Sequence, residues 1–182
     1  MLRQQYRASL DRCQTLSNVG TLCTPLVVLR SLSETDEMIG LLQRVTSATV
    51  TVEGEQIAAI GDGLLVLVGV EKEDTPAHAE RLAERLLSYR VFADAEGRMN
   101  LDLGQAGGKI LLVPQFTLAA DTGQGNRPGF SRAADLETGL KLFEILVAAM
   151  RQRGQSPATG RFGAHMEVNL CNDGPVTFWL QV

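Results

Sequence analysis

The sequence predicts an α/β protein: a single three-layer domain in which a mixed, barrel-like β-sheet packs with two main helices. The first observation is the order of elements: two strands, then two strand–helix units, then three strands. Strand–helix alternation implies parallel pairing in the middle of the sheet, and flanking hairpins imply antiparallel edges. The second is a pair of short, wholly apolar segments of the length of buried strands. The third is composition: 182 residues with 45% hydrophobic and 21% charged residues suit one globular domain.

The first half of the sheet is predicted from alternation and turns. Ile39–Val45 and Ala48–Glu53 are expected to be strands, since Val and Thr alternate in the second. A tight turn leads to a third strand, Gln56–Ile60, and a Gly-Asp-Gly turn leads to Leu64–Val70. The last of these is apolar on both faces and is expected to be a central buried strand.

The first helix is predicted to begin at Asp74-Thr75-Pro76, where a capping side chain precedes proline, and to run to about Tyr89. Arg90–Ala93 then predicts a short strand, and Lys109–Phe116 a second buried strand. Thr122–Phe130 is polar and rich in glycine, which indicates a surface loop.

The second helix is predicted over Leu136–Arg151. Its apolar positions are Leu140, Phe143, Ile145, Leu146, Val147 and Met150. Phe162–Leu170 and Val176–Val182 are expected to be the last strands, joined by a turn over Asn172–Pro175. By spacing alone, Gly174-Pro175 is the tip of a hairpin.

Residues 1–37 differ in pattern from the body over 38–182. We interpret them as a poorly ordered N-terminal extension, or as translated upstream sequence with the start at Met38. The alternative is a targeting peptide, since Leu2, Tyr6 and Leu10 form a weak helical stripe beside arginines. The three cysteines form neither a metal-type spacing nor an even-numbered disulfide framework, which favours a reducing cytoplasm.

Charge limits the choice of partners. A net charge of −4 argues against a broad basic surface for nucleic acid, although a local patch remains possible. Candidates for phosphate contacts are Arg127, Arg132, Lys141 and Arg161. No metal or cofactor is expected, because His78 and His165 lie far apart and no glycine-rich dinucleotide motif follows a strand.

Two segments remain as candidates for chemistry. Gln115-Phe116-Thr117 ends a buried strand, where exposed amide groups could stabilise an oxyanion. Thr117 could be a nucleophile, but a threonine without a base is more often a turn hydroxyl. Cys171 is expected to be a buried, inert thiol, and His165 a solvated strand residue. The second segment is Gly174-Pro175.

These segments belong to an ordered set of motifs that spans Met38–Val182 and resembles the bacterial D-aminoacyl-tRNA deacylase family. The motifs are Leu42-Gln43-Arg44-Val45, the strand Gly63–Val70, Gly97–Leu101, Gln115–Leu118, Arg127-Pro128, Thr159–Phe162 and Asn172–Phe178. The resemblance implies hydrolysis of the ester that joins a D-amino acid, or glycine, to the 3′ end of tRNA. It further implies a homodimer with the site at the interface and no cofactor.

The resemblance also assigns roles to residues. It implies that Gln115, Phe116 and Thr117 line the pocket for the terminal adenosine and the scissile ester. Gly174-Pro175 corresponds to a Gly–cisPro motif inserted from the partner subunit, with Arg44 bracing it, and Phe162 and Met166 lie near the amino end of the substrate. Two positions depart from the family: Pro114 replaces a usual serine, and His165 a frequent aspartate.

Two expectations about the mechanism follow. Rigid backbone can exclude every L side chain with one steric wall, and glycine allows a close approach. Since no side chain is an obvious base, the ribose 2′-hydroxyl is expected to assist the attack. Two alternatives stay open: a non-catalytic nucleic-acid-binding dimer on the same fold, and an editing enzyme with a trans Gly–Pro bond and relaxed chirality.

Overall fold

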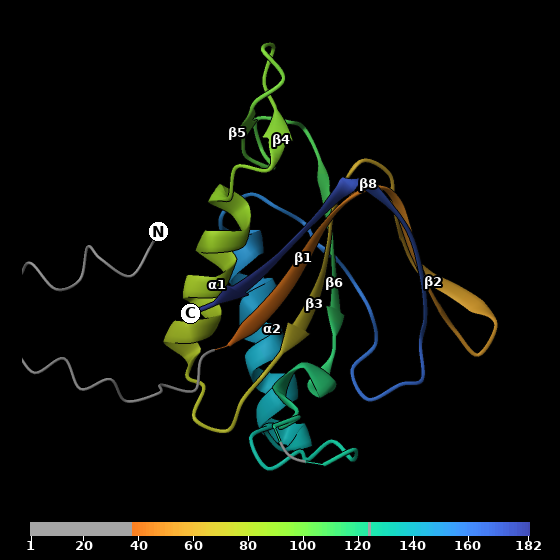
Figure 1. Cartoon of the computed structure of the whole chain (residues 1–182), viewed down its shortest axis with the longest axis vertical. Coiled ribbons are helices and arrows are strands. Elements are labelled where there is room, and N and C mark those ends of the chain that lie inside the picture. The colour runs from red at the N-terminus through yellow and green to blue at the C-terminus, as the bar shows by residue number, and fades with distance from the viewer. Residues whose placement is uncertain (1–37, 124) are drawn as a thin grey trace, which may run out of the picture. The chain divides into compact units, whose positions relative to one another are not determined.

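The computed structural model describes residues 38–123 and 125–182, so the predicted N-terminal extension lies outside the described residues. In the described part, a mixed sheet nearly closes into a barrel beside two α-helices, which confirms the predicted fold class (Figure 1). The strands are β1 (Ile39–Val52), β2 (Glu55–Ile60), β3 (Gly63–Gly69), β4 (Phe92–Ala93), β5 (Met99–Leu101), β6 (Lys109–Pro114), β7 (Ala158–Thr159) and β8 (Glu167–Gln181). The helices are α1 (Pro76–Ser88), η1 (Phe116–Ala119), which is a 3-10 turn, and α2 (Leu136–Gln152).

The long strand β1 organises the sheet. Its first half pairs antiparallel with β3 and its second half with β2, while β8 runs antiparallel along its other edge. β3 pairs with β6 in parallel, and β6 pairs with β7 in parallel. The strand order is therefore β2-β1-β3-β6-β7, with β8 added to β1, and β4 and β5 form a separate hairpin.

Two apolar clusters produce the three layers. One lies between the helices and the sheet, where Leu82 and Leu86 of α1 meet Leu64 and Leu112 of the central strands. The other fills the curl of the sheet: its members are Val45, Ala48, Val50, Leu65, Leu111 and Val113. β3 and β6 are covered on both sides, which explains why their sequences are apolar on both faces.

Both helices begin where the sequence predicts. In α1 the Thr75 hydroxyl accepts a hydrogen bond from the His78 amide, and Pro76 occupies the first turn. In α2 the Asp135 carboxylate accepts from the Thr138 amide. One predicted core position is wrong: Leu140 is 39% exposed, since it lies at the edge of the apolar stripe of α2.

The strand boundaries need correction in two places. The two predicted N-terminal strands are one continuous strand, β1, with register shifts in its ladder to β8 beside Arg44 and near Ser47. The two predicted C-terminal strands are likewise one strand, β8, so Asn172–Pro175 is no hairpin turn. Bulges absorb the extra residues without ending the ladder, and alternation alone does not show this.

Cys171 and His165 also differ from expectation. The Cys171 side chain is exposed and not buried, since residues 169–171 of β8 are all exposed. His165 is exposed as predicted, but it precedes β8 instead of lying within a strand. Of the helices in the described part of the chain, none is long and apolar enough to cross a membrane.

Candidate functional site

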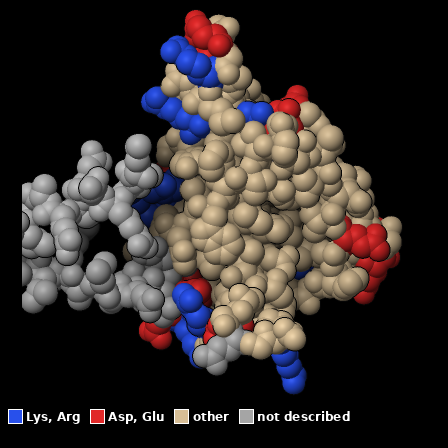
Figure 2. Space-filling model, in the orientation of Figure 1, with Lys and Arg blue, Asp and Glu red and all other residues tan. Residues whose placement is uncertain are grey.

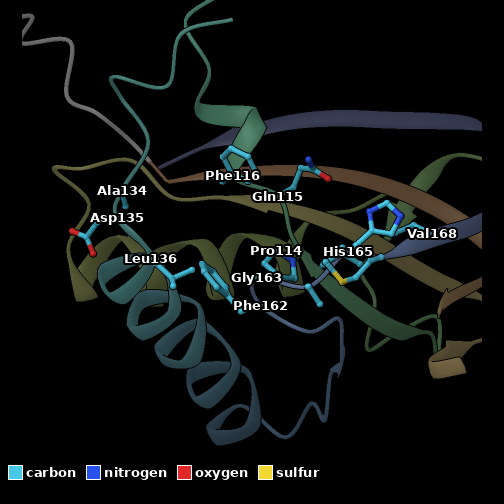
Figure 3. Close-up of a pocket in the computed structure, with 13 residues that line it drawn as sticks. Pro114, Gln115, Phe116, Ala134, Asp135, Leu136, Phe162, Gly163, His165 and Val168 are labelled. Carbon is cyan, nitrogen blue, oxygen red and sulfur yellow. The ribbon is translucent and has the colours of Figure 1, made fainter. Parts of the chain in front are cut away.

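A cavity of about 460 Å³ opens at the C-terminal end of β6 (Figure 3). Its walls come from the end of β6, the start of α2 and the segment before β8. The lining residues are Val113, Pro114, Gln115, Phe116, Ala134, Asp135, Leu136, Phe162, Gly163, Ala164, His165, Met166 and Val168. Most of these side chains are apolar, with few polar groups among them, a composition typical of small-ligand sites.

The Gln115–Thr117 segment leaves the sheet at this end. The Gln115 amide donates to the Val68 carbonyl at 2.7 Å, which extends the β3–β6 pairing by one bond before η1 begins. Gly69 lets η1 pack closely, since a Cβ there would lie 2.8 Å from the Leu118 Cβ. The backbone turn after β6 is therefore held against the middle of the sheet.

Thr117 lies beside the cavity and is not among its lining residues. Its exposed hydroxyl accepts a hydrogen bond from the side-chain amide of Gln115. An amide N–H donor cannot remove a proton, so this contact gives Thr117 no general base.

Phe162 and Met166 form the opposite wall, and a glycine makes room for each. A Cβ on Gly139 of α2 would lie 2.9 Å from the Phe162 ring, and one on Gly160 would lie 2.8 Å from the Met166 sulfur. The Phe162 ring also packs against Phe143, with centroids 6.2 Å apart. The wall is thus fixed by close packing on α2 and the β7 end.

Asp135 and His165 are the ionisable side chains that line the cavity. Hydrogen bonds from the Thr138 amide and hydroxyl lower the pKa of the Asp135 carboxyl below its ordinary value. The carboxylate is therefore charged at neutral pH, and the rim of an otherwise apolar cavity is negative near the start of α2.

The Gly174-Pro175 segment projects from β8 as a wide bulge. Gln43 pairs with Thr177 and Val45 with Asn172, so residues 173–176 have no partner in β1. The Asn172 side chain provides hydrogen bonds in place of those to β1. It accepts a hydrogen bond from the Val176 amide at 2.7 Å and donates one to the Val176 carbonyl at 3.3 Å. Both tip residues are exposed.

Arg44 lies opposite this bulge. Its Nε is 2.8 Å from Oδ2 of Asp173, and its Nη1 donates to the Val91 carbonyl. Gly174 has φ of +127°, a conformation that favours glycine, and a Cβ there would lie 3.2 Å from the Arg44 guanidinium. The Gly174-Pro175 peptide bond is cis, the isomer that the resemblance implied, and not the trans bond of the editing-enzyme alternative.

Within one chain the predicted site residues therefore form two groups. Gln115, Phe116, Phe162 and Met166 line the cavity, with Thr117 adjoining it. Arg44, Gly174 and Pro175 form the other group and do not line it.

Sequence reasoning missed three contributors. Asp135 and Leu136 line the cavity, and Asn172 holds the bulge. In the sequence Asp135 directly precedes the predicted second helix, a position that indicates a capping residue and gives no sign of a ligand site. In residues 38–123 and 125–182, no group of three or more His, Cys, Asp or Glu side chains could hold a metal ion.

Known proteins similar to this chain indicate its family. A family model described as D-Tyr-tRNA(Tyr) deacylase matches residues 41–181. A D-aminoacyl-tRNA deacylase of Nitrosococcus oceani is 62% identical over 145 residues, covering 80% of this chain and 94% of its own. The corresponding protein of Citrobacter koseri is 59% identical over 145 residues, covering 80% of this chain and 100% of its own.

Two solved structures share the fold. One, titled c-Myc DNA Unwinding Element Binding Protein, has a TM-score of 0.75 at 39% identity and covers 79% of this chain and 98% of its own. The other, titled as a probable eukaryotic D-amino acid tRNA deacylase, has a TM-score of 0.68 at 17% identity and covers 80% of this chain and 99% of its own. The family model and the close relatives together establish that the chain belongs to the D-Tyr-tRNA(Tyr) deacylase family.

Proposed function

We propose that the protein is a hydrolase that cleaves the ester bond of D-aminoacyl-tRNA and releases the free D-amino acid and tRNA. The observation that carries this proposal is the cavity at the end of β6, lined by Gln115, Phe116, Phe162 and Met166, which the resemblance assigns to the substrate pocket. The volume of this cavity, about 460 Å³, lies within the range of small-molecule sites. Because its substrate would be aminoacyl-tRNA, we expect the protein to act in the cytoplasm.

Backbone groups carry the proposed chemistry. The first N–H groups of a helical turn have no partner inside the turn, so the amides of Phe116 and Thr117 at the start of η1 are suited to an oxyanion. Water adds to the ester carbonyl, assisted by the neighbouring ribose 2′-hydroxyl. The bond between the carbonyl carbon and the ribose oxygen then breaks, and the ribose oxygen takes a proton.

The selection of D- over L-aminoacyl esters is assigned to the partner subunit of a homodimer. Gly174 and Pro175 are exposed and stand away from the cavity of their own chain, a position suited to entering the cavity of a second copy. β8 also exposes Leu170 by 37% and Trp179 by 50%. Figure 2 supports an interface here, since the face over β1 and β8 is almost free of charged side chains.

A wall of main chain gives a simple rule for specificity. An L side chain attached to a fixed ester would meet the Gly174-Pro175 backbone, while a D side chain would point away from it. Glycine has no side chain to exclude, so glycyl-tRNA should also be cleaved. Arg44 supports the wall through its ion pair with Asp173.

The test of the activity is a deacylation assay with D-tyrosyl-tRNA and glycyl-tRNA. Both are expected to lose their amino acid faster with enzyme than in buffer. Absence of acceleration for D-tyrosyl-tRNA, with folded protein, contradicts the proposed function.

The second candidate is a non-catalytic nucleic-acid-binding dimer. It is favoured by the 39% identical structure whose title names a DNA-unwinding-element binding protein. This alternative predicts binding of tRNA or DNA without ester cleavage. The same assay, combined with a filter-binding measurement, separates the two candidates.

A further inference from the structure

The end of the segment between η1 and α2, together with the first residue of α2, supplies one wall of the cavity. Ala134, Asp135 and Leu136 line it, and the Phe130 ring packs on Phe116 with centroids 5.1 Å apart. This segment belongs to no strand of the main sheet and forms only isolated bridges in the described part of the chain. Its position therefore depends on a few specific contacts.

Those contacts come from the residues that follow β3. Glu71 and Ala133 form an antiparallel bridge, in which the Lys72 amide donates to the Arg132 carbonyl at 2.9 Å. The Ala134 amide donates to the Val70 carbonyl at 3.0 Å. The backbone just before the cavity wall is thus tied to the end of a core strand.

An ion pair reinforces the same junction. The Arg132 guanidinium lies 3.1 Å from both carboxylate oxygens of Glu71. The Glu71 side chain is 2% exposed and that of Arg132 is 50% exposed. A buried carboxylate needs its partner, so the pair holds Arg132 in place more firmly than a surface pair would.

The Glu71 backbone is itself fixed from a third side. Its amide donates to Oδ2 of Asp74 at 2.7 Å, and the other oxygen of Asp74 contacts the His78 ring at 3.1 Å. The end of β3, the start of α1 and the loop before α2 therefore meet around two buried carboxylates, those of Glu71 and Asp74.

We propose that the Glu71–Arg132 ion pair positions the cavity wall at Ala134–Leu136 for the substrate. Arg132 is a positioning residue, and the phosphate contact considered from the sequence is not its role. The kinetic test of this inference rests on the proposed function, because it measures cleavage of D-tyrosyl-tRNA. The hydrogen-exchange test does not depend on the proposed function.

The kinetic test compares Arg132→Met with Arg132→Lys in single-turnover cleavage of D-tyrosyl-tRNA at several salt concentrations. Arg132→Met is expected to lower the maximal rate about tenfold, and Arg132→Lys, which keeps the charge, to recover most of it. The slope of log affinity against log salt is expected to stay that of the wild type. A normal rate with a slope reduced by about 0.7, the value of one contact to a single-stranded phosphate, overturns the proposal.

Two further variants keep the test decisive. Arg81→Met removes an exposed ion pair with Glu84 on α1 and is the matched control, expected to behave as wild type. Glu71→Gln keeps the side-chain shape, and combining it with Arg132→Met should cost no more than either change alone. Multiplicative losses in the double variant overturn the pairing.

Hydrogen exchange separates this proposal from the proposed function. Arg132→Met is expected to speed amide exchange at Ala133–Leu136 about tenfold, while Arg81→Met leaves it unchanged. Unchanged exchange in Arg132→Met overturns the inference whatever the activity. Faster exchange in a protein that cleaves no D-tyrosyl-tRNA supports the positioning role and refutes only the proposed activity.

Discussion

Gly69 is the position where one methyl group should move the proposed catalytic turn. It pairs with Ile39 at the end of β3, directly beneath η1. A Cβ at this position would lie 2.8 Å from the Leu118 Cβ and 3.5 Å from the Gln115 carbonyl oxygen. Both Cβ atoms are fixed by backbone, so no rotamer change can relieve the contact.

The size of the effect follows from this distance. Carbon atoms pack best at about 3.5–4.0 Å, so the Gly69→Ala variant must separate β3 and η1 by about 1 Å. Overpacking of this kind costs about 1–3 kcal/mol of the free energy of unfolding. A misplacement of about 1 Å at reacting groups can cost about 100-fold in rate. We therefore expect a folded protein with a strongly reduced rate.

The assay is single-turnover deacylation of D-tyrosyl-tRNA, with the unfolding midpoint measured in parallel. Gly61→Ala is the matched control, because nothing lies within 4 Å of the Cβ it would add, and its rate should equal that of the wild type. A folded Gly69→Ala variant that cleaves as fast as the wild type would refute the claim that the turn at Phe116 must be held in place.

Three further changes test other parts of the site. In Gly139→Ala the added Cβ would lie 2.9 Å from the Phe162 ring, so the ring must move. The helix preference of alanine, about 1 kcal/mol, is then offset by overpacking of about 1–3 kcal/mol, and substrate binding should weaken several-fold. An unchanged substrate concentration at half-saturation would contradict this. Thr117→Ala should retain most activity in the deacylation assay, and a loss above about 1000-fold would instead indicate a covalent threonine mechanism. The pKa of the Asp135 carboxyl is lower in the folded protein than its ordinary value near 3.9. The carboxylate therefore stabilises the fold fully above a pH of about 3.9, and this stabilisation is lost as the pH falls through the lower pKa of the folded state. Asp135→Asn should accordingly melt lower than wild type at pH 7, with the difference vanishing in acid; a constant difference contradicts this.

Local signals predicted most of the fold. Apolar runs marked β3 and β6, and Thr75-Pro76 marked the start of α1, because each pattern is caused by burial or capping within a few residues. The continuity of β1 and β8 was not predictable in the same way. The β8 bulge depends on the Asn172 side chain pairing with the Val176 backbone, and turn residues in sequence look the same with or without it.

One wall of the candidate cavity lies at the strand end where the sequence predicted a site, and another wall depends on distant contacts that the sequence did not indicate. The end of β6 indicated the Gln115–Thr117 segment, since ligands commonly bind where buried strands end. The wall at Asp135 and Leu136 is placed by Glu71 and Arg132, which are 61 residues apart in the chain. No spacing rule connects such residues, so only the three-dimensional structure reveals the junction.

Exclusion of L side chains by main chain at Gly174 is the central claim, and a comparison of matched D- and L-tyrosyl-tRNA tests it most directly. The wild type should cleave the D ester more than about 100-fold faster than the L ester. In Gly174→Ala a Cβ would lie 2.6 Å from a Val176 methyl, so the displaced wall should admit the L ester and raise its rate. Equal rates for the two esters in the wild type would contradict the account.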